Sequence, residues 1–84
     1  MTFDIKWKPK TFKVLKKLPQ KISKRIWDKV WSIKSNPFRY LEHYEGESLY
    51  KLRVGDYRAL IDVDFDKKLL IVQVLDKRGR VYKK

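Results

Sequence analysis

Three cationic side chains lie close together in the stretch YKLRVGDYR at residues 50–58. Gly55-Asp56 is typical of a tight two-residue turn, and the hairpin register that it fixes puts Arg53 directly opposite Arg58, with Lys51 two residues along. Like charges that face each other across a ladder destabilise a sheet by about 0.2–1 kcal/mol. The planar fork of arginine binds two phosphate oxygens at once. The facing arginines therefore favour a phosphate-binding site, and the alternative is that both side chains simply extend into water.

A further arginine approaches the same place from a neighbouring strand. If Asp64 pairs with Leu69 in the next hairpin, the register sets Arg78 roughly level with the Gly55-Asp56 turn. Arg58 and Arg78 would then converge on one concave surface. A cluster of cations on an otherwise ordinary sheet is a local strain of the kind that collects at functional sites.

Two other features carry chemically active side chains. Asp62, Asp64 and Asp66 alternate in DVDFD, a spacing that can hold Mg²⁺ in a nuclease, but charged strand edges and turns are the more usual explanation. His43 is the only histidine, and it lies in an irregular segment with no partner nearby in the sequence. We expect it to be a loop or packing residue. No metal and no cofactor are expected.

The formal net charge of the 84 residues is +12, which makes a polyanion the leading class of partner. The absence of cysteine excludes a disulfide scaffold, a zinc ribbon and a thiol nucleophile. The longest apolar run, LLIVQVL at 69–75, is far shorter than the roughly 20 residues that cross a bilayer. With no signal peptide in the sequence, we expect a cytoplasmic protein that makes no membrane contact.

Hydrophobic periodicity divides the chain into helices and strands. Alternation in TFDIKW predicts a half-buried strand at 2–7. Pro9 suits the first turn of a helix that Pro19 ends, and a second helix then runs to the SNP at 35–37. Residues 38–47 lack a clean period and indicate a loop or short extended piece. The remaining strands are predicted at 48–54, 57–64 and 69–76.

This order, βααβββ, predicts a single α+β domain over residues 1–84, with two N-terminal helices packed on a mostly antiparallel four-stranded sheet. Trp27 and Trp31 of the second helix are expected in the core. Alternation assigns to the core face Tyr50, Leu52, Val54, Tyr57, Ala59, Ile61, Val63, Leu70, Val72 and Val74. It assigns to the opposite face Lys51, Arg53, Arg58, Leu60, Asp62, Asp64, Ile71, Gln73 and Leu75.

The segments NPF, LYKLRVGDYRALIDVD and VLDKRGRVYKK together resemble the RelE/ParE toxin superfamily, and within it the RelE-like mRNA interferases. The resemblance covers essentially the whole chain. It implies a toxin of a type II toxin-antitoxin system that cuts mRNA in the ribosomal A site and is held inactive by a cognate antitoxin. It also implies a metal-independent endoribonuclease, with basic residues and a C-terminal tyrosine in place of a histidine pair.

Carried over residue by residue, the resemblance implies catalytic roles for Lys51, Arg53, Arg58, Arg78 and Tyr82. Arg53 and Arg58 would stabilise charge on the scissile phosphate, and Arg78 would lie at the leaving oxygen. Tyr82 would stack on a base or contact the 2′-hydroxyl. Because arginine cannot be deprotonated usefully, Lys51 is the candidate general base, unless positioning within the ribosome suffices. RNA contacts are expected from Lys77, Arg80 and Lys83.

Two other functions remain open at this point. In a non-catalytic RNA-binding or ribosome-binding protein, the same cations would only bind phosphates. A ParE-like member of the superfamily would act on DNA gyrase. The lysine-rich helices can either follow ribosomal RNA or accept an acidic antitoxin, and the sequence does not separate these two partners.

Overall fold

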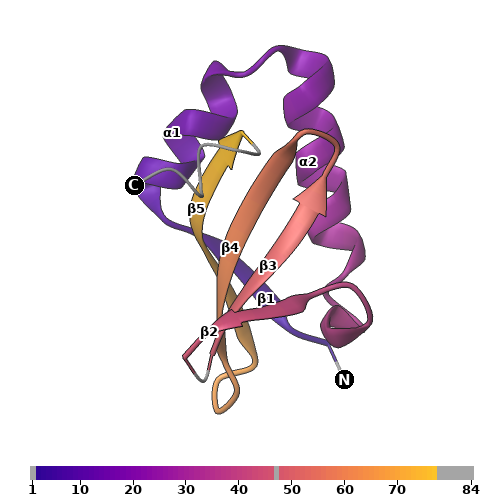
Figure 1. Ribbon diagram of the computed structural model, residues 1–84, viewed down its shortest axis with the longest axis vertical. Helices are drawn as coiled ribbons and strands as arrows, with labels where there is room; N and C mark the ends of the chain where they lie inside the picture. Colours follow the sequence, from indigo (N-terminus) through magenta and orange to yellow (C-terminus); the bar gives the residue numbers. More distant parts are fainter. Residues whose placement is uncertain (1, 47, 78–84) are drawn as a thin grey trace.

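A five-stranded sheet organises the computed structural model, which describes residues 2–46 and 48–77 (Figure 1). Its order is β1-β5-β4-β3-β2; β1 and β5 run parallel, and the other neighbouring pairs run antiparallel. The fold confirms the predicted α+β class and mostly antiparallel sheet. The elements in chain order are β1 (Asp4–Trp7), α1 (Pro9–Lys17), α2 (Gln20–Ser32), the 3-10 helix η1 (Pro37–Arg39), β2 (Glu42–Glu45), β3 (Leu49–Val54), β4 (Tyr57–Asp64) and β5 (Leu69–Lys77).

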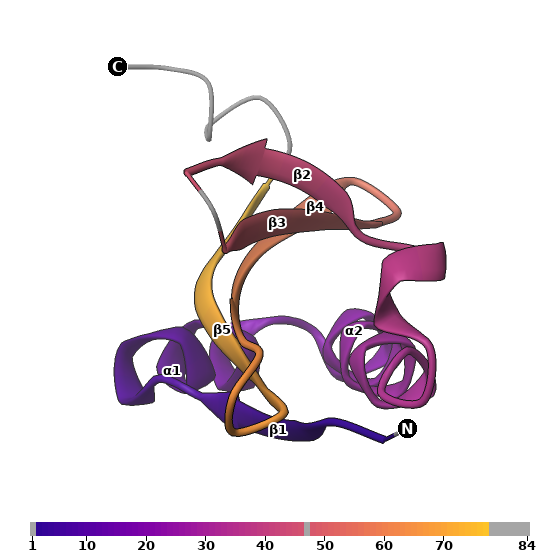
Figure 2. The same cartoon turned by 90° about the horizontal axis from the view of Figure 1, so that it is seen from below.

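The sheet curves, so that α2 lies inside the curve and α1 lies beside β5 (Figure 2). Both helices begin at prolines that suit a helix start or a helix boundary: Pro9 is the first residue of α1, and Pro19 precedes α2 in an extended conformation. The hydrophobic core between the helices and the sheet consists of Phe3, Leu15, Ile26, Val30, Ile33, Leu41, Leu52, Val54, Ala59, Ile61, Val63, Leu70, Val72 and Leu75.

The strand β2 makes the sheet one strand wider than the four strands that the sequence predicts. Two of its four residues, EHYE, are glutamates, and the segment lacks the apolar alternation that would predict a strand. Pairing with β3 creates it instead, with Glu42 opposite Lys51 and His43 opposite Tyr50. An edge strand of this kind is short and charged, which protects the sheet edge from pairing with other chains.

A β-bulge in β5 corrects the predicted faces of that strand. Asp64 pairs with Leu69 as predicted, but the register shifts by one residue between Leu60 and Ile61. Leu75 therefore enters the core, where the sequence predicts Val74, and Val74 is 40% exposed. Gln73 occupies the bulge, and its carbonyl accepts a hydrogen bond of 2.7 Å from the hydroxyl of the buried Thr11 on α1. This bond satisfies a backbone group that the bulge removes from the ladder.

The expectation that Trp27 and Trp31 lie in the core is wrong, because their side chains are 36% and 43% exposed. The core face of α2 is filled by the stripe of Ile26 and Val30, and each tryptophan follows one of these residues, about 100° further around the helix. Trp27 stacks on Trp7 of β1, with the ring centroids 5.6 Å apart. The tryptophans thus form the border of the helical layer.

Candidate functional site

The first hairpin brings three of the predicted site residues onto one face of the sheet. Arg53 pairs with Arg58 and Lys51 with Leu60, which confirms the register predicted from the turn. Gly55 has a φ of 60°, the left-handed conformation that favours glycine in such a turn. The facing arginines are therefore a real feature of the fold.

The three cations differ in their surroundings. Arg53 is exposed, whereas Arg58 is completely buried, with an exposed fraction of 0%. Across its other ladder Arg58 faces Asp76, because the bulge moves this carboxylate into register with it. Lys51 is mostly buried, and its Nζ lies 3.5 Å from Oε1 of Glu42 on β2. Opposite charge beside Arg58 offsets part of the repulsion from Arg53 and part of the cost of burying the guanidinium.

The remaining predicted site residues lie at the C-terminal end of the chain. Lys77 closes β5 and is exposed, opposite Tyr57. Arg78, Arg80, Tyr82 and Lys83 lie outside the described residues. The convergence of Arg58 and Arg78 and the role of the tyrosine accordingly stay predictions.

Two adjoining hollows lie beside the hairpin, and Lys29 and Arg53 line both of them. The first, of about 150 Å³, also contains Tyr40, Glu42 and Lys51. The second, of about 460 Å³, extends along α2. It adds Arg25, Asp28, Ser32, Val54 and Gly55. We refer to the two hollows together as the α2–β3 groove.

Sequence reasoning missed that α2 contributes to this site. Arg25 and Lys29 are four residues apart, a spacing that puts both side chains on one face of a helix. That spacing was a usable signal, but which way the face points depends on how α2 packs. Nothing in the sequence around Tyr40, which follows η1, indicated that this residue lies at the site.

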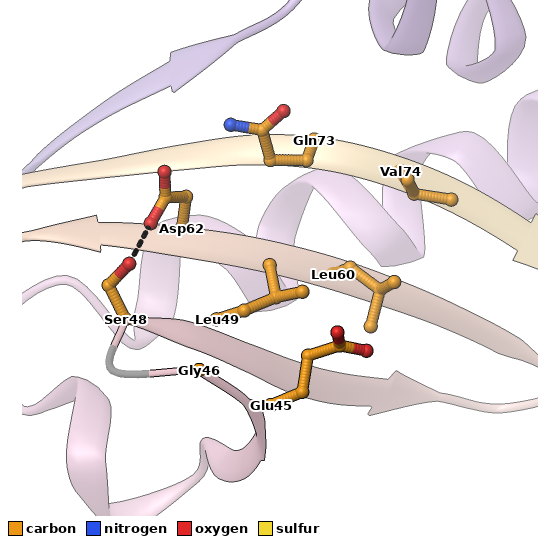
Figure 3. Close-up of a pocket in the computed structure, with 8 residues that line it drawn as sticks. All are labelled: Glu45, Gly46, Ser48, Leu49, Leu60, Asp62, Gln73 and Val74. Atoms are coloured by element: carbon orange, nitrogen blue, oxygen red, sulfur yellow. Dashed lines mark hydrogen bonds between the residues drawn. The ribbon is translucent and has the colours of Figure 1, made fainter.

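Another hollow, of about 480 Å³, lies on the outer face of the sheet (Figure 3). Leu49, Leu60 and Val74 give it an apolar floor, and the hydroxyl of Ser48 donates a hydrogen bond to Asp62 at its edge. None of the described residues that line it is cationic. Its chemistry suits an apolar contact more than a phosphate.

Asp62, Asp64 and His43 make contacts that stabilise the fold. Asp62 accepts the bond from Ser48, and Asp64 accepts a 3.0 Å hydrogen bond from the backbone of Lys67 in the β4–β5 turn. Within residues 2–46 and 48–77 no three potential ligands come close enough to hold a metal. The ring of His43 packs edge-on against Tyr50, with centroids 5.5 Å apart. No helix in the described part of the chain is long and apolar enough to span a bilayer.

Comparisons with known proteins find relatives of the chain in sequence and in fold. Residues 5–81 match the family model of the ParE toxin of the type II toxin-antitoxin system parDE. A curated relative, the putative toxin RelE1 of Methanocaldococcus jannaschii, is 25% identical over 88 residues, covering 99% of this chain and 98% of the relative.

Solved structures show the same fold. RelE in the RelE-RelB complex of Pyrococcus horikoshii superposes with a TM-score of 0.82 at 28% identity, over 95% of this chain and 99% of that one. The toxin-antitoxin complex RelBE2 of Mycobacterium tuberculosis gives a TM-score of 0.83 at 20% identity, over 93% and 100% of the two chains, which supports the fold alone. The family match over nearly the whole sequence and the RelE-like structure confirm the resemblance found in the sequence, and the chain belongs to the RelE/ParE superfamily of type II toxins as a RelE-like member.

Proposed function

We propose that this RelE-like toxin is an endoribonuclease that cuts mRNA in the ribosomal A site and so inhibits translation. The observation that carries the proposal is the pair of facing arginines, Arg53 and Arg58, with Lys51 on the same face of the sheet. Two arginines paired across a ladder can supply the guanidinium groups that bind one phosphate. The net charge of +12 supports an RNA-rich target.

The reaction proposed is transesterification within the RNA backbone. The ribose 2′-oxygen forms a bond to the adjacent phosphorus as the bond from phosphorus to the 5′-oxygen breaks, leaving a 2′,3′-cyclic phosphate and a 5′-hydroxyl. Negative charge builds up on the nonbridging oxygens, where Arg53 and Arg58 would stabilise it. One such donor in a preorganised site lowers the activation barrier by roughly 3–4 kcal/mol. Because Arg58 is buried, its neighbours must rearrange before it reaches a phosphate.

Protons must also move in this reaction. A guanidinium cannot accept the proton of the 2′-hydroxyl, so that step is assigned to the unprotonated amine of Lys51, which must first give up the proton of its ammonium form to water. In the proposal Arg78 stabilises the leaving 5′-oxygen, which takes its proton from water, and Tyr82 stacks on a base or contacts the 2′-hydroxyl. Lys77, Arg80 and Lys83 bind the RNA backbone.

An antitoxin protein, the ribosome and mRNA are the partners that the proposal requires, and their location makes the toxin cytoplasmic. Two of the solved RelE relatives are complexes with a RelB antitoxin. In this chain Phe12, Trp27 and Trp31 form a contiguous exposed surface, here called the helical aromatic patch. Exposed apolar surface of this kind marks a site of protein interaction and supports an antitoxin partner.

The test compares cutting with mere binding. Purified protein is added to a translating ribosome extract, and mRNA ends are mapped by primer extension for the wild type, Arg53→Gln and Arg58→Ala. Arg39→Gln, which removes an exposed arginine of η1 outside the site, is the matched control. Circular dichroism establishes that each variant is folded.

Cuts confined to A-site codons, present with the wild type and Arg39→Gln and lost in the two site variants, support the proposal. Intact mRNA with translation still blocked refutes the nuclease and indicates a ribosome-binding protein. No effect on translation refutes both and leads to a gyrase assay, the target expected of a ParE-like member.

A further inference from the structure

The α2–β3 groove exists because the edge of β3 that faces away from β4 pairs with β2 for only part of its length. The first residue of β2, Glu42, pairs with Lys51, so β3 continues beyond the start of its neighbour. Along Leu52, Arg53 and Val54 the groove opens towards α2 instead. The open side of β3 is thus faced by the cationic side chains of a helix.

Two cations of α2 extend the cationic hairpin sideways. Arg25 and Lys29 line the groove with Arg53, which joins its two halves. Gly55 leaves room for the end of the Arg25 side chain, because a Cβ at that position would lie 3.0 Å from the Arg25 guanidinium. Arg25, Lys29, Lys51 and Arg53 therefore form a continuous positive surface.

The carboxylates of the groove already have lysine partners. Asp28 lies 2.9 Å from Lys24 on the next turn of α2, and Glu42 lies 3.5 Å from Lys51. Both carboxylates are also outnumbered by the cations that line the groove. The electrostatic balance of the groove consequently favours an anion.

An aromatic ring stands at the end of this positive surface. Tyr40 is 42% exposed and lines the hollow that holds Lys51 and Arg53. The ammonium of Lys29 lies 4.4 Å from the ring centroid, a cation–π contact that holds the ring at the edge of the groove. A positive channel with an exposed aromatic ring is the arrangement that proteins use for single-stranded nucleic acid, where bases stack and phosphates bind.

We propose that the α2–β3 groove binds the nucleotides of single-stranded RNA that flank the scissile phosphate, with Tyr40 stacking on a base and Arg25 and Lys29 binding phosphates. This inference rests on the proposed function, because it places the flanking nucleotides relative to Arg53. Tyr40, Arg25 and Lys29 act here as binding residues, remote from the bonds that form and break.

Binding is measured without ribosomes, so that it is separate from cutting. The probe is a fluorescein-labelled 12-nucleotide single-stranded RNA with 2′-deoxy sugars, read by anisotropy at several salt concentrations between 50 and 200 mM. A duplex of the same sequence is the second probe. The variants are Tyr40→Ala, Tyr40→Phe and Lys29→Gln, and Lys21→Gln removes one charge from α2 outside the groove.

If a base stacks on the ring of Tyr40, Tyr40→Ala should weaken the binding of single-stranded RNA by about 5- to 100-fold, and Tyr40→Phe should bind it as the wild type does. Loss of a phosphate contact in Lys29→Gln lowers the slope of log affinity against log salt by about 0.7, and Lys21→Gln leaves the slope unchanged. Duplex binding does not depend on the ring at position 40, because paired bases cannot stack on it.

The outcomes separate this inference from the proposed function. If Tyr40→Ala binds single strands as well as Tyr40→Phe does, or Lys29→Gln behaves like Lys21→Gln, the groove is not an RNA subsite, whatever the extract shows. If the variants lose binding as expected but the wild type leaves mRNA intact, the subsite stands and the nuclease proposal fails.

Discussion

Removing the positive charge of Arg53 should stabilise the fold while it abolishes cutting. Arg53 is exposed and faces the buried Arg58 directly, so Arg53→Gln relieves a repulsion without leaving a cavity. Facing like charges cost about 0.2–1 kcal/mol, and Asp76 on the far side of Arg58 places the pair in the lower half of that range. A gain of about 0.2–0.5 kcal/mol raises the melting temperature of a domain of this size by roughly 1–4 °C.

Thermal unfolding by circular dichroism checks this gain, with Arg39→Gln as the control that removes an exposed arginine outside the strands of the sheet. The gain should be largest at low salt and vanish near 1 M NaCl, where charges are screened within about 3 Å. In an Asp76→Asn background it should grow, because the repulsion is then no longer offset. Cutting in the ribosome extract should fall about 100- to 1,000-fold in Arg53→Gln.

Two results would refute the reasoning. A lower melting temperature for Arg53→Gln at low salt, with Arg39→Gln unchanged, means that the charge at position 53 supports the fold and the hairpin is not strained. Cutting within tenfold of the wild type means that Arg53 does not stabilise the charge that develops on the phosphate. The first result does not bear on the nuclease proposal, and the second removes the main support of that proposal.

Three further variants test other parts of the structure. Thr11→Val leaves the Gln73 carbonyl without its buried donor and should cost about 1–3 kcal/mol in urea unfolding; no loss would mean that water replaces the hydroxyl. Gly55→Ala should weaken RNA binding more than Gly46→Ala does. Both glycines have a positive φ, but only a side chain at position 55 would crowd Arg25 of the groove. Equal binding by the two variants would mean that Arg25 does not contact RNA. Trp31→Ser should weaken antitoxin binding in a pull-down at least tenfold and leave the rate of mRNA cutting unchanged. Unchanged antitoxin binding would mean that the antitoxin does not bind the helical aromatic patch.

The sequence was sufficient where local geometry determines the structure. A two-residue turn fixes register, so the pairing of Arg53 with Arg58 followed from Gly55-Asp56 alone. It was not sufficient for the bulge, since LLIVQVL suits either Val74 or Leu75 as a core residue and the choice depends on packing against α1. The prediction that Trp31 lies in the core was wrong for a similar reason. A helical period gives the direction of the apolar face, but not how far the core extends around the helix.

The bulge at Gln73 links the helical layer to the cationic face. Without the inserted residue, the register that starts at Asp64 and Leu69 would put Asp76 opposite Tyr57, on the core side of the sheet. With it, Leu75 fills the core and Asp76 comes into register with the buried Arg58.

A buried guanidinium with no opposite charge nearby costs several kcal/mol, so this shift is what allows Arg58 to be buried in the sheet. The hydroxyl of Thr11 completes the bulge from α1. A change in the helix, far along the chain from the arginines, should therefore lower cutting as well as stability. Thr11→Val tests this coupling: if the folded variant cuts like the wild type, the bulge serves the core alone.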